Sequence, residues 1–363
     1  MQIELPISKS IANRWLMLQA IHGDELMPVS DSMPDDVQIL HRALTTLHNP
    51  TQSYTTLHLS NCGTAMRFLT AYAAQLENRV TILDGVERMH HRPIGQLVDA
   101  LREIGADIEY LGEEGFPPLR IKGCILNKHR EVTITNPQST QFISALLLIG
   151  VNVQTNSTSP YIYITQEVIK QYQLSPFSFH LTVEKDWSAA AFWYEYVALH
   201  GSKIELPGLY KDSLQGDKVV ANIFSHLGVH TTYTAEGIIL SPIAYSEASY
   251  SPLSGRPIAA QAASHSKILV QDFGNCPDLY PAVALTCERL GIELHATGVE
   301  SLLLKESDRL RAVAEHRADA DHRMAMALLI AGYEVDDTTC ISKSYPQFLE
   351  HFHQLQENNC LHS

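Results

Sequence analysis

The chain lacks several features that would assign it to familiar classes of protein. No apolar run approaches the roughly 20 residues that a membrane span needs, and Met1 is followed by Gln-Ile-Glu-Leu-Pro instead of a basic and then apolar leader. We therefore expect a cytoplasmic protein that makes no membrane contact. The six cysteines of the 363 residues lie far apart and form no Cys-x-x-Cys pair, which fits reduced thiols better than a disulfide framework or a zinc site.

Positive charge is also in short supply. Lys and Arg number 26 against 40 Asp and Glu, a net charge of −14. This balance argues against nucleic acid as a partner, because such binding draws most of its affinity from clustered cations that meet phosphates. The pairs His90-His91 and His351/His353 have no partners at metal-ligand spacing, so we expect no metal. No Gly-x-Gly-x-x-Gly or Gly-x-x-x-x-Gly-Lys loop exists, and we expect no cofactor.

What the chain does contain is one pattern that returns six times: a few small polar residues, then an apolar helix rich in Ala, Leu and Met. The six segments begin at Ser8, Asn61, Gln138, Asp186, Cys276 and Asp321. Helices that are apolar all round belong inside a domain, and the free N–H groups of their first turn can bind anions. We therefore predict six buried helices with polar N-termini.

Amphipathic helices that lead into strands lie between these segments. Helical spacing of apolar residues runs from Arg92 to Gly105 and from Asp217 to Gly228, and alternating strands follow at 106–110 and 229–233. A weaker copy, Asp36 to Leu44, precedes a strand at 55–59. A length of 363 residues allows two domains, and six such units, taken three and three, predict two similar α/β domains.

The densest group of charged residues is Lys305-Glu306-Ser307-Asp308-Arg309. Ser307 or Asp308 can cap a helix that starts here, and the positive end of its dipole would favour an anion held by the two cations. The stretch can therefore grip an anion and move a proton beside it. The alternative interpretation is a solvated, charged first turn.

Eight motifs run along the chain from end to end. They are Ser8-Lys9-Ser10-x-x-Asn13-Arg14, Asn61-x-Gly63-Thr64-Ala65-Met66-Arg67, Arg88-Met89-x-x-Arg92-Pro93, Gln141-Phe142-x-Ser144-Ala145-Leu146-Leu147, Gln215-Gly216-Asp217, Lys305-Glu306-Ser307-Asp308-Arg309, Asp321-His322-Arg323-Met324-Ala325-Met326 and Lys343-Ser344-Tyr345-Pro346. Taken together and in this order, they resemble the motifs of the 5-enolpyruvylshikimate-3-phosphate synthase family. The resemblance implies transfer of the enolpyruvyl group of phosphoenolpyruvate to the 5-hydroxyl of shikimate 3-phosphate.

The resemblance also assigns roles to residues. It implies that phosphoenolpyruvate is held by Lys9, Arg92, Arg309, Arg323 and Lys343. Arg14 would bind the shikimate carboxylate, Ser139 and its neighbours the 3-phosphate, and Gln141 both substrates. Ser10, Gly63, Thr140 and Lys305 complete the implied binding set. Asp278 would act as base and Glu306 as acid, with proton transfer assisted by Lys9 or Lys343. Arg67 is either a ligand contact or structural support.

The same resemblance implies a domain layout. Residues 8–184 would form one domain and residues 1–7 with 185–363 the other, each built of three β-α-β-α-β-β units with buried parallel helices and outward-facing sheets. We expect a monomer whose split site is closed by its anionic substrates. Two rivals remain: transfer to a UDP-amino sugar on the same fold, and a catalytically silent anion-binding or scaffold protein.

Some positions depart from the family's usual pattern. Ser301 stands where an Asn often touches shikimate, and either Thr158 or Ser159 could meet the phosphate. The helix that starts at Arg309 meets Asp321 without a Gly stop or a strand. The stretches 152–157 and 174–177 look similarly short. We predict that loops are missing from the sequence and that the chain is interrupted between Glu315 and Asp321 by a Cα step far longer than about 3.8 Å; an unbroken chain would indicate a genuine deletion.

Overall fold

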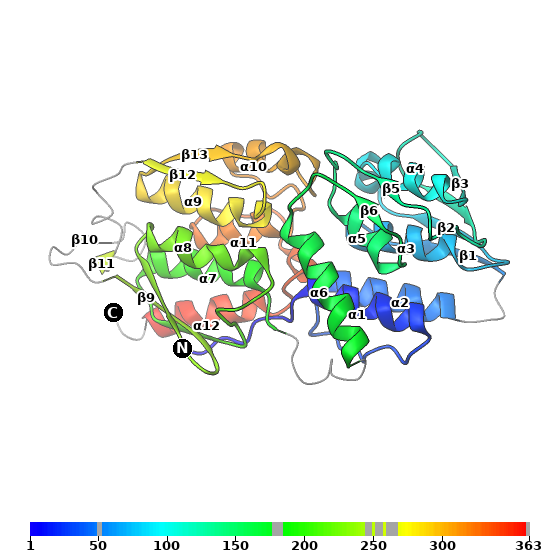
Figure 1. The fold of residues 1–363 in the computed structure, drawn as a ribbon. Helices are drawn as coiled ribbons and strands as arrows, with labels where there is room; N and C mark the ends of the chain where they lie inside the picture. Colours follow the sequence, from blue (N-terminus) through cyan, green and yellow to red (C-terminus); the bar gives the residue numbers. More distant parts are fainter. Residues whose placement is uncertain (49–52, 176–183, 244–248, 251–256, 259–267, 361–363) are drawn as a thin grey trace. The chain divides into compact units, whose positions relative to one another are not determined.

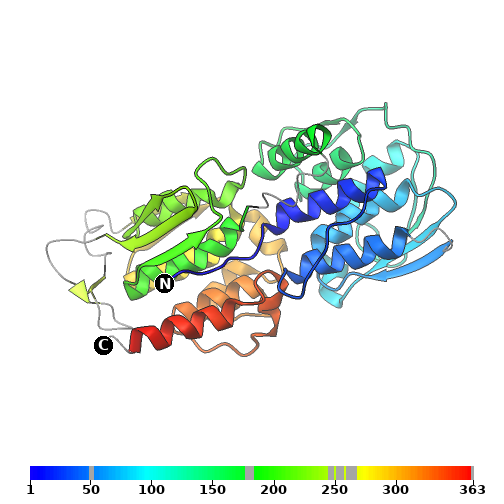
Figure 2. The same cartoon turned by 90° about the horizontal axis from the view of Figure 1, so that it is seen from below.

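Figures 1 and 2 show the computed structural model of the chain, which describes residues 1–48, 53–175, 184–243, 249–250, 257–258 and 268–360. The chain divides into two compact units. We call Lys9–Asp31 with Asp35–Val183 the N-terminal unit, and Met1–Ser8 with Ser32–Pro34 and Glu184–Ser363 the C-terminal unit. None of the helices in the described ranges is long and apolar enough to cross a membrane. The predicted α/β fold in two parts is confirmed.

The largest sheet of the N-terminal unit is one complete β-α-β-α-β-β unit. Its elements are β1 (Tyr54–His58), α3 (Gly63–Ala74), β2 (Val80–Asp84), α4 (Gly95–Glu103), β3 (Asp107–Tyr110) and β4 (Leu119–Lys122). The strand order is β1-β2-β4-β3, with β1 parallel to β2 and the other two pairings antiparallel. A smaller parallel pair joins β5 (Val132–Thr133) to β6 (Val153–Gln154).

The C-terminal unit repeats this strand order with the help of the first residues of the chain. Gln2 forms a parallel bridge to Glu205 in β7 (Ile204–Pro207), and Ile3 N donates to the Glu205 carbonyl over 2.9 Å. Strand β7 pairs with β9 (Gly237–Pro242), which pairs with β8 (Val229–Tyr233), both antiparallel. The first residues of the chain therefore lie beside β7 where β1 lies beside β2 in the N-terminal unit.

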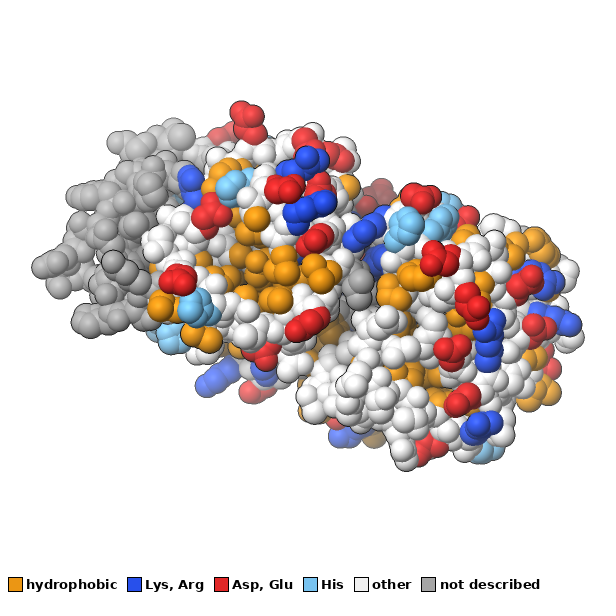
Figure 3. Space-filling view, turned by 90° about the horizontal axis from the view of Figure 1, so that it is seen from above, with side chains coloured by type: hydrophobic (Ala, Val, Ile, Leu, Met, Phe, Trp, Pro, Cys, Tyr) orange, Lys and Arg blue, Asp and Glu red, His pale blue; other side chains and the backbone are white. Residues whose placement is uncertain are grey.

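A second sheet of the C-terminal unit shows that its sheets face outward. Strands β12 (Ile268–Asp272) and β13 (Glu293–Thr297) pair in parallel across α9 (Tyr280–Leu290). Ile268 and Val270 of β12 are 43% and 70% exposed. Figure 3 shows apolar side chains gathered on this face of the unit among charged ones. A further short pair is β10 (Ser249–Tyr250) with β11 (Pro257–Ile258).

The six predicted buried helices are all present. They are α1 (Lys9–His22), α3 and α5 (Gln141–Leu148) in the N-terminal unit, and α7 (Trp187–His200), α9 and α11 (His322–Ile330) in the C-terminal unit. In α7 every residue from Trp187 to Leu199 is buried. Helices α7, α9 and α11 contact one another and lie side by side in Figures 1 and 2.

The remaining helices cover or connect these elements. They are α2 (Asp35–His48), α6 (Pro160–Leu174), α8 (Val220–Ser225), α10 (Arg309–Glu315), α12 (Phe348–Cys360) and the 3₁₀ turns η1 (Glu87–His91), η3 (Gly216–Val219), η5 (Pro277–Leu279), η6 (Glu300–Leu304) and η7 (Thr339–Lys343). The predicted amphipathic helices correspond to α4, α2, and η3 with α8, so the helical periodicity located them correctly.

The predicted interruption between Glu315 and Asp321 is wrong, because the chain turns there without a break. Helix α10 ends at Glu315 and is capped by His316, whose φ of 53° is left-handed, and Arg317 N donates to the Ala312 carbonyl over 2.9 Å. Asp319 and Ala320 are also left-handed, with φ of 49° and 57°. This tight turn takes the chain directly to α11. The stretch 152–157 contains β6, and residues 176–177 lie outside the described residues.

The apolar core of the C-terminal unit contains the carboxyl group of Glu195. Glu195 in α7 is fully buried, and neither of its carboxyl oxygens has a hydrogen-bond partner within the described residues. Burial raises the pKa of Glu195 well above its ordinary value of 4.5. The folded protein therefore keeps this proton at pH values where the unfolded chain releases it.

We predict that Glu195→Leu stabilises the protein more at pH 8 than at pH 5. A raised folded-state pKa means that stability is lost as the pH rises above about 4.5, and the variant removes that loss. The expected gain at pH 8 is about 1–3 kcal/mol, the range for an unsatisfied buried polar group. Urea unfolding at both pH values checks this, with Glu195→Gln as the uncharged polar control. A pH dependence identical in wild type and the Leu variant would contradict it.

Candidate active site

The guanidinium of Arg309 is the centre of the charged group in the C-terminal unit. Arg309 begins α10, which Asp308 caps by accepting from Arg311 N over 3.2 Å. The Arg309 side chain is 1% exposed and contacts three carboxylates. Its Nη1 lies 2.9 Å from Asp278 Oδ1, its Nη2 lies 3.3 Å from Glu306 Oε2, and its Nε lies 2.8 Å from Asp321 Oδ2.

Asp278 accepts from three cations. It lies in η5, at the start of α9, and its Oδ1 also contacts Lys305 Nζ at 3.2 Å. Its Oδ2 lies 3.1 Å from Arg323 Nη2. Three neighbouring cations favour the ionised form of this carboxyl group. Burial lowers the pKa of Lys305, and the nearby charge of Asp278 opposes that shift.

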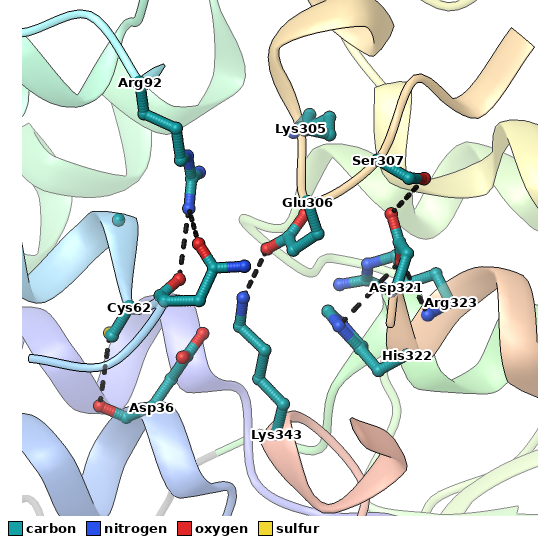
Figure 4. A network of polar contacts seen from close by, with 12 residues as sticks. Asp36, Cys62, Arg92, Lys305, Glu306, Ser307, Asp321, His322, Arg323 and Lys343 are labelled. Carbon is teal, nitrogen blue, oxygen red and sulfur yellow. Dashed lines mark hydrogen bonds and ion pairs between the residues drawn. The ribbon is translucent and has the colours of Figure 1, made fainter. Parts of the chain in front are cut away.

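Glu306 lies on the other side of Arg309 and is paired with a second cation. Lys343 Nζ approaches Glu306 Oε1 to 2.6 Å, as Figure 4 shows, and the Glu306 side chain is 9% exposed. Asp278 and Glu306, the two residues expected to transfer protons, thus both lie beside cations, and both contact Arg309.

Asp321 connects Arg309, Ser307 and the first turn of α11, a role that the sequence did not indicate. Its Oδ1 accepts from Arg323 N over 2.9 Å and so caps α11, while Ser307 Oγ donates to its Oδ2 over 3.3 Å (Figure 4). The Asp321 side chain is fully buried. Its position in the motif identified it only as a helix start.

A further buried carboxyl group, Asp217 of the Gln215-Gly216-Asp217 motif, lies near Asp278. Burial and the negative charge of Asp278 raise the pKa of Asp217 to about 7. Ser188 Oγ donates to its Oδ2. Gln215 Oε1 accepts from Trp187 N over 3.1 Å, so the motif fixes the first turn of α7. The site thus contains a carboxyl group that titrates close to neutral pH.

In the N-terminal unit, Lys9 and Arg92 are connected through contacts of Asp36, Cys62 and Asn61. Lys9 Nζ lies 3.1 Å from Asp36 Oδ2. The thiol of Cys62 lies 3.8 Å from the Asp36 carbonyl and accepts from Ala65 N, which caps α3 (Figure 4). Arg92 Nη1 donates to the Asn61 carbonyl and to Asn61 Oδ1 over 3.1 and 3.3 Å. The sequence did not indicate Asp36 as the partner of Lys9.

Gly63 leaves room for two guanidinium groups. A Cβ at this position would lie 2.5 Å from Arg92 Nη2 and 2.4 Å from Arg67 Nη1. Arg67 donates to the carbonyls of Gly63 and Pro93 over 3.0 and 2.9 Å. These backbone contacts favour structural support as the role of Arg67. The absence of a side chain at Gly63 is therefore a packing requirement of the site.

The other predicted residues of the N-terminal unit gather where α1 and α5 begin. Arg14 is fully buried and donates to the Ser10 carbonyl over 2.7 Å and to Gln141 Oε1 over 3.4 Å. Ser139 Oγ accepts from Gln141 N over 3.4 Å, and Thr140 precedes the first residue of α5. Tyr161 N donates to Ser159 Oγ, so Ser159 caps α6.

The predicted residues thus form one group in the C-terminal unit and two groups in the N-terminal unit. The C-terminal group comprises Asp278, Lys305, Glu306, Arg309, Arg323 and Lys343. The N-terminal groups are Lys9, Gly63 and Arg92, and Ser10, Arg14, Ser139, Thr140 and Gln141. The described part of the chain holds no set of three His, Cys, Asp or Glu residues arranged to bind a metal.

Comparison with known proteins gives consistent matches along nearly the whole chain. Residues 1–173, 148–317 and 313–352 match the family model described as EPSP synthase (3-phosphoshikimate 1-carboxyvinyltransferase). A 3-phosphoshikimate 1-carboxyvinyltransferase of Bacteroides fragilis is 36% identical over 407 aligned positions, which cover 95% of this chain and 93% of that protein. The Cellvibrio japonicus enzyme of the same name is 30% identical over 433 positions, with 97% and 96% covered.

Solved structures show the same fold at lower identity. An EPSP synthase of Acinetobacter baumannii superposes with a TM-score of 0.64 at 18% identity, covering 98% of this chain and 95% of that one. The enolpyruvyl transferase NikO of Streptomyces tendae gives a TM-score of 0.62 at 12% identity, with 98% and 94% covered.

The alignments are longer than this chain. The alignment with the Bacteroides fragilis relative spans 407 positions, more than the 363 residues of this chain, so that relative carries internal segments that this chain lacks. The order of the motifs, the family match and the fold nevertheless agree. The chain belongs to the EPSP synthase (3-phosphoshikimate 1-carboxyvinyltransferase) family.

Proposed function

We propose that this chain transfers the enolpyruvyl group of phosphoenolpyruvate to the 5-hydroxyl of shikimate 3-phosphate and releases phosphate. The observation that carries the proposal is the arrangement around Arg309: one buried guanidinium contacts both Asp278 and Glu306, and each of these contacts further cations. An acid and a base are thus held next to a set of anion-binding groups. Membership of the family supports the same reaction.

The substrates explain the types of residue in the site. Together they carry two phosphates and two carboxylates, which need several cations in a poorly hydrated place, with Arg preferred for two-pronged contacts. We assign Lys9, Arg92, Arg309, Arg323 and Lys343 to phosphoenolpyruvate. Four of these cations, Lys9, Arg309, Arg323 and Lys343, now contact Asp36, Asp278 or Glu306, which compensates their charges until an anion binds.

Asp278 and Glu306 divide the proton transfers between them. In the addition step the 5-hydroxyl oxygen bonds to C2 of phosphoenolpyruvate, Asp278 takes the hydroxyl proton, and Glu306 gives a proton to the methylene carbon C3. In the elimination step the C2–O bond to phosphate breaks, Glu306 takes a proton back from C3, which restores the double bond, and the proton held by Asp278 goes to the departing phosphate. Lys343, 2.6 Å from Glu306, assists the proton transfers of that carboxyl group.

Phosphate release tests the proposal. Purified protein is incubated with phosphoenolpyruvate and, in turn, shikimate 3-phosphate, a UDP-amino sugar, or no acceptor. We expect release with shikimate 3-phosphate alone. Release with the UDP-amino sugar would show that this sugar is the enolpyruvyl acceptor instead. No release with any acceptor would show that the protein binds anions without this activity.

We predict that Lys9→Ala and Arg323→Ala each lower turnover about 100-fold or more, the usual loss when a charge-stabilising group is removed. Lys9→Ala should lower the melting temperature less than Arg323→Ala does, because the Lys9 side chain is the more exposed of the two, at 16%. Arg323→Ala should also lower the melting temperature, because the Arg323 side chain is 2% exposed and paired with Asp278. Phosphate release and thermal melting are measured together.

The control for this pair is Lys170→Ala, which removes a lysine whose side chain is 67% exposed and lies 3.8 Å from Glu167. It should change neither measurement. Near-normal turnover in Lys9→Ala or Arg323→Ala would remove that residue from the mechanism.

We also predict that Asp278→Asn and Glu306→Gln bind shikimate 3-phosphate within about tenfold of wild type, roughly 1.4 kcal/mol. Each should lose about 100-fold or more of kcat, since each is asked to move a proton. The amides keep the shape of the side chains and leave the surrounding cations in place for anions. Calorimetric titration and steady-state rates test this. If binding collapsed together with rate in both variants, the acid and base assignment would fail.

Gly63→Ala provides a steric test of the assignment of Arg92. A Cβ at Gly63 would lie 2.5 Å from Arg92 Nη2, so the guanidinium must move. We expect the KM for phosphoenolpyruvate to rise about tenfold or more, as for a displaced charged contact, with a smaller change for shikimate 3-phosphate. Gly112→Ala is the control, because its Cβ would lie 3.5 Å from Pro118 Cδ, an ordinary contact. An unchanged KM for phosphoenolpyruvate would remove Arg92 from that pocket.

A further inference from the structure

Arg14 carries a buried charge that no acidic side chain compensates within the described residues. Its side chain is fully buried in α1, and its hydrogen-bond acceptors are hydroxyl, amide and carbonyl oxygens. The guanidinium also lies over the Phe68 ring, 5.5 Å from the centroid. A buried cation without a counter-ion is unfavourable unless its donors are well satisfied. Burial lowers the pKa of Arg14 to about 10, which reflects this strain on the charged form.

Two hydroxyl groups supply the acceptors that Arg14 needs. Thr165 Oγ1 in α6 accepts from Arg14 Nε over 2.7 Å, and Ser144 Oγ in α5 accepts from Nη2 over 3.1 Å. The two hydroxyl oxygens lie 2.8 Å apart. Both side chains are fully buried. The carbonyl of Tyr161, 3.1 Å from Nη2, completes a polar network that three helices build around one guanidinium.

We propose that Thr165 and Ser144 are positioning residues that hold Arg14 charged and in one orientation for binding of shikimate 3-phosphate. This inference rests on the proposed function. Because the two acceptors are neutral, the positive charge of Arg14 is not cancelled inside the protein. A doubly anionic ligand with a carboxylate is therefore attracted to this part of the N-terminal unit.

The same network sets the direction of the Gln141 amide. Arg14 has N–H donors and no acceptor, so the atom that it contacts at 3.4 Å is the amide oxygen of Gln141. The amide nitrogen of Gln141, with its two donors, is thereby directed away from Arg14. Gln141 begins α5 and is only partly buried, so these donors are available to an anionic substrate. If the Arg14 guanidinium rotated, the Gln141 amide would no longer be held in this orientation.

The chain offers a matched control for Thr165. Thr70 in α3 is also fully buried, and its hydroxyl donates to the carbonyl four residues earlier, Met66, over 2.7 Å. Thr165 makes the same contact with Tyr161 over 2.7 Å. The difference is that Thr165 also accepts from a guanidinium, whereas no cation contacts the Thr70 hydroxyl among the described residues. Thr165→Val and Thr70→Val therefore remove equivalent helical contacts, and only the first removes an acceptor of Arg14.

Calorimetric titration with shikimate 3-phosphate, without phosphoenolpyruvate, measures the effect directly. We expect the Kd to rise at least tenfold in Thr165→Val, and to stay within about threefold of wild type in Thr165→Ser, which restores the hydroxyl. Thr70→Val should bind like wild type. Ser144→Ala should weaken binding in the same direction and serves as the second variant if Thr165→Val does not fold. In steady-state assays the KM for shikimate 3-phosphate should rise while that for phosphoenolpyruvate stays within about twofold.

The outcomes separate this inference from the function on which it rests. If wild type binds shikimate 3-phosphate and folded Thr165→Val or Ser144→Ala binds it equally well, the positioning role is wrong and the proposed function stands. Equal losses of affinity for shikimate 3-phosphate in Thr165→Val and Thr70→Val would also overturn the positioning role, because altered packing alone would then explain the weaker binding. If wild type neither binds nor turns over shikimate 3-phosphate, the proposed function fails and this inference fails with it.

Discussion

The burial of the Arg309 guanidinium among Asp278, Glu306 and Asp321 is the interaction on which the C-terminal site depends. Charges of this kind are tolerated in a protein interior only when they are paired, and removing one partner leaves another uncompensated. The three carboxylates come from η5, the stretch before α10 and the cap of α11. One guanidinium therefore holds three separate segments in register, and two of its partners are the residues assigned to proton transfer.

Much of this arrangement could be predicted from the sequence because it depends on local patterns. Polar caps before apolar runs located the six buried helices, and alternation located β1, β3 and β8. The pairing of buried groups could not be predicted in the same way. Asp321 read as a cap, and Asp36 read as part of an amphipathic first turn; their contacts with Arg309 and Lys9 depend on how distant helices pack. The burial of Arg14 beside Thr165 is another contact of this kind, across 151 positions of sequence.

The turn after α10 shows why a sequence rule gave the wrong result. Helix ends elsewhere in the chain, such as Gly201 and Gly291, use glycine in the left-handed region. Here His316 takes that conformation, and its ring lies 2.8 Å from Glu288 and stacks on Tyr333 with centroids 4.1 Å apart. Side-chain contacts thus stabilise a left-handed backbone conformation at His316 that the absence of glycine argued against.

The central claim is that these paired charges serve the transfer of an enolpyruvyl group, and the fate of both substrates tests it most directly. Phosphorus and proton NMR of one reaction containing phosphoenolpyruvate and shikimate 3-phosphate can follow inorganic phosphate and the vinyl protons of the product together. We expect one enol ether to form for each phosphate released. Phosphate without a new enol ether, or both substrates left unchanged, would contradict it.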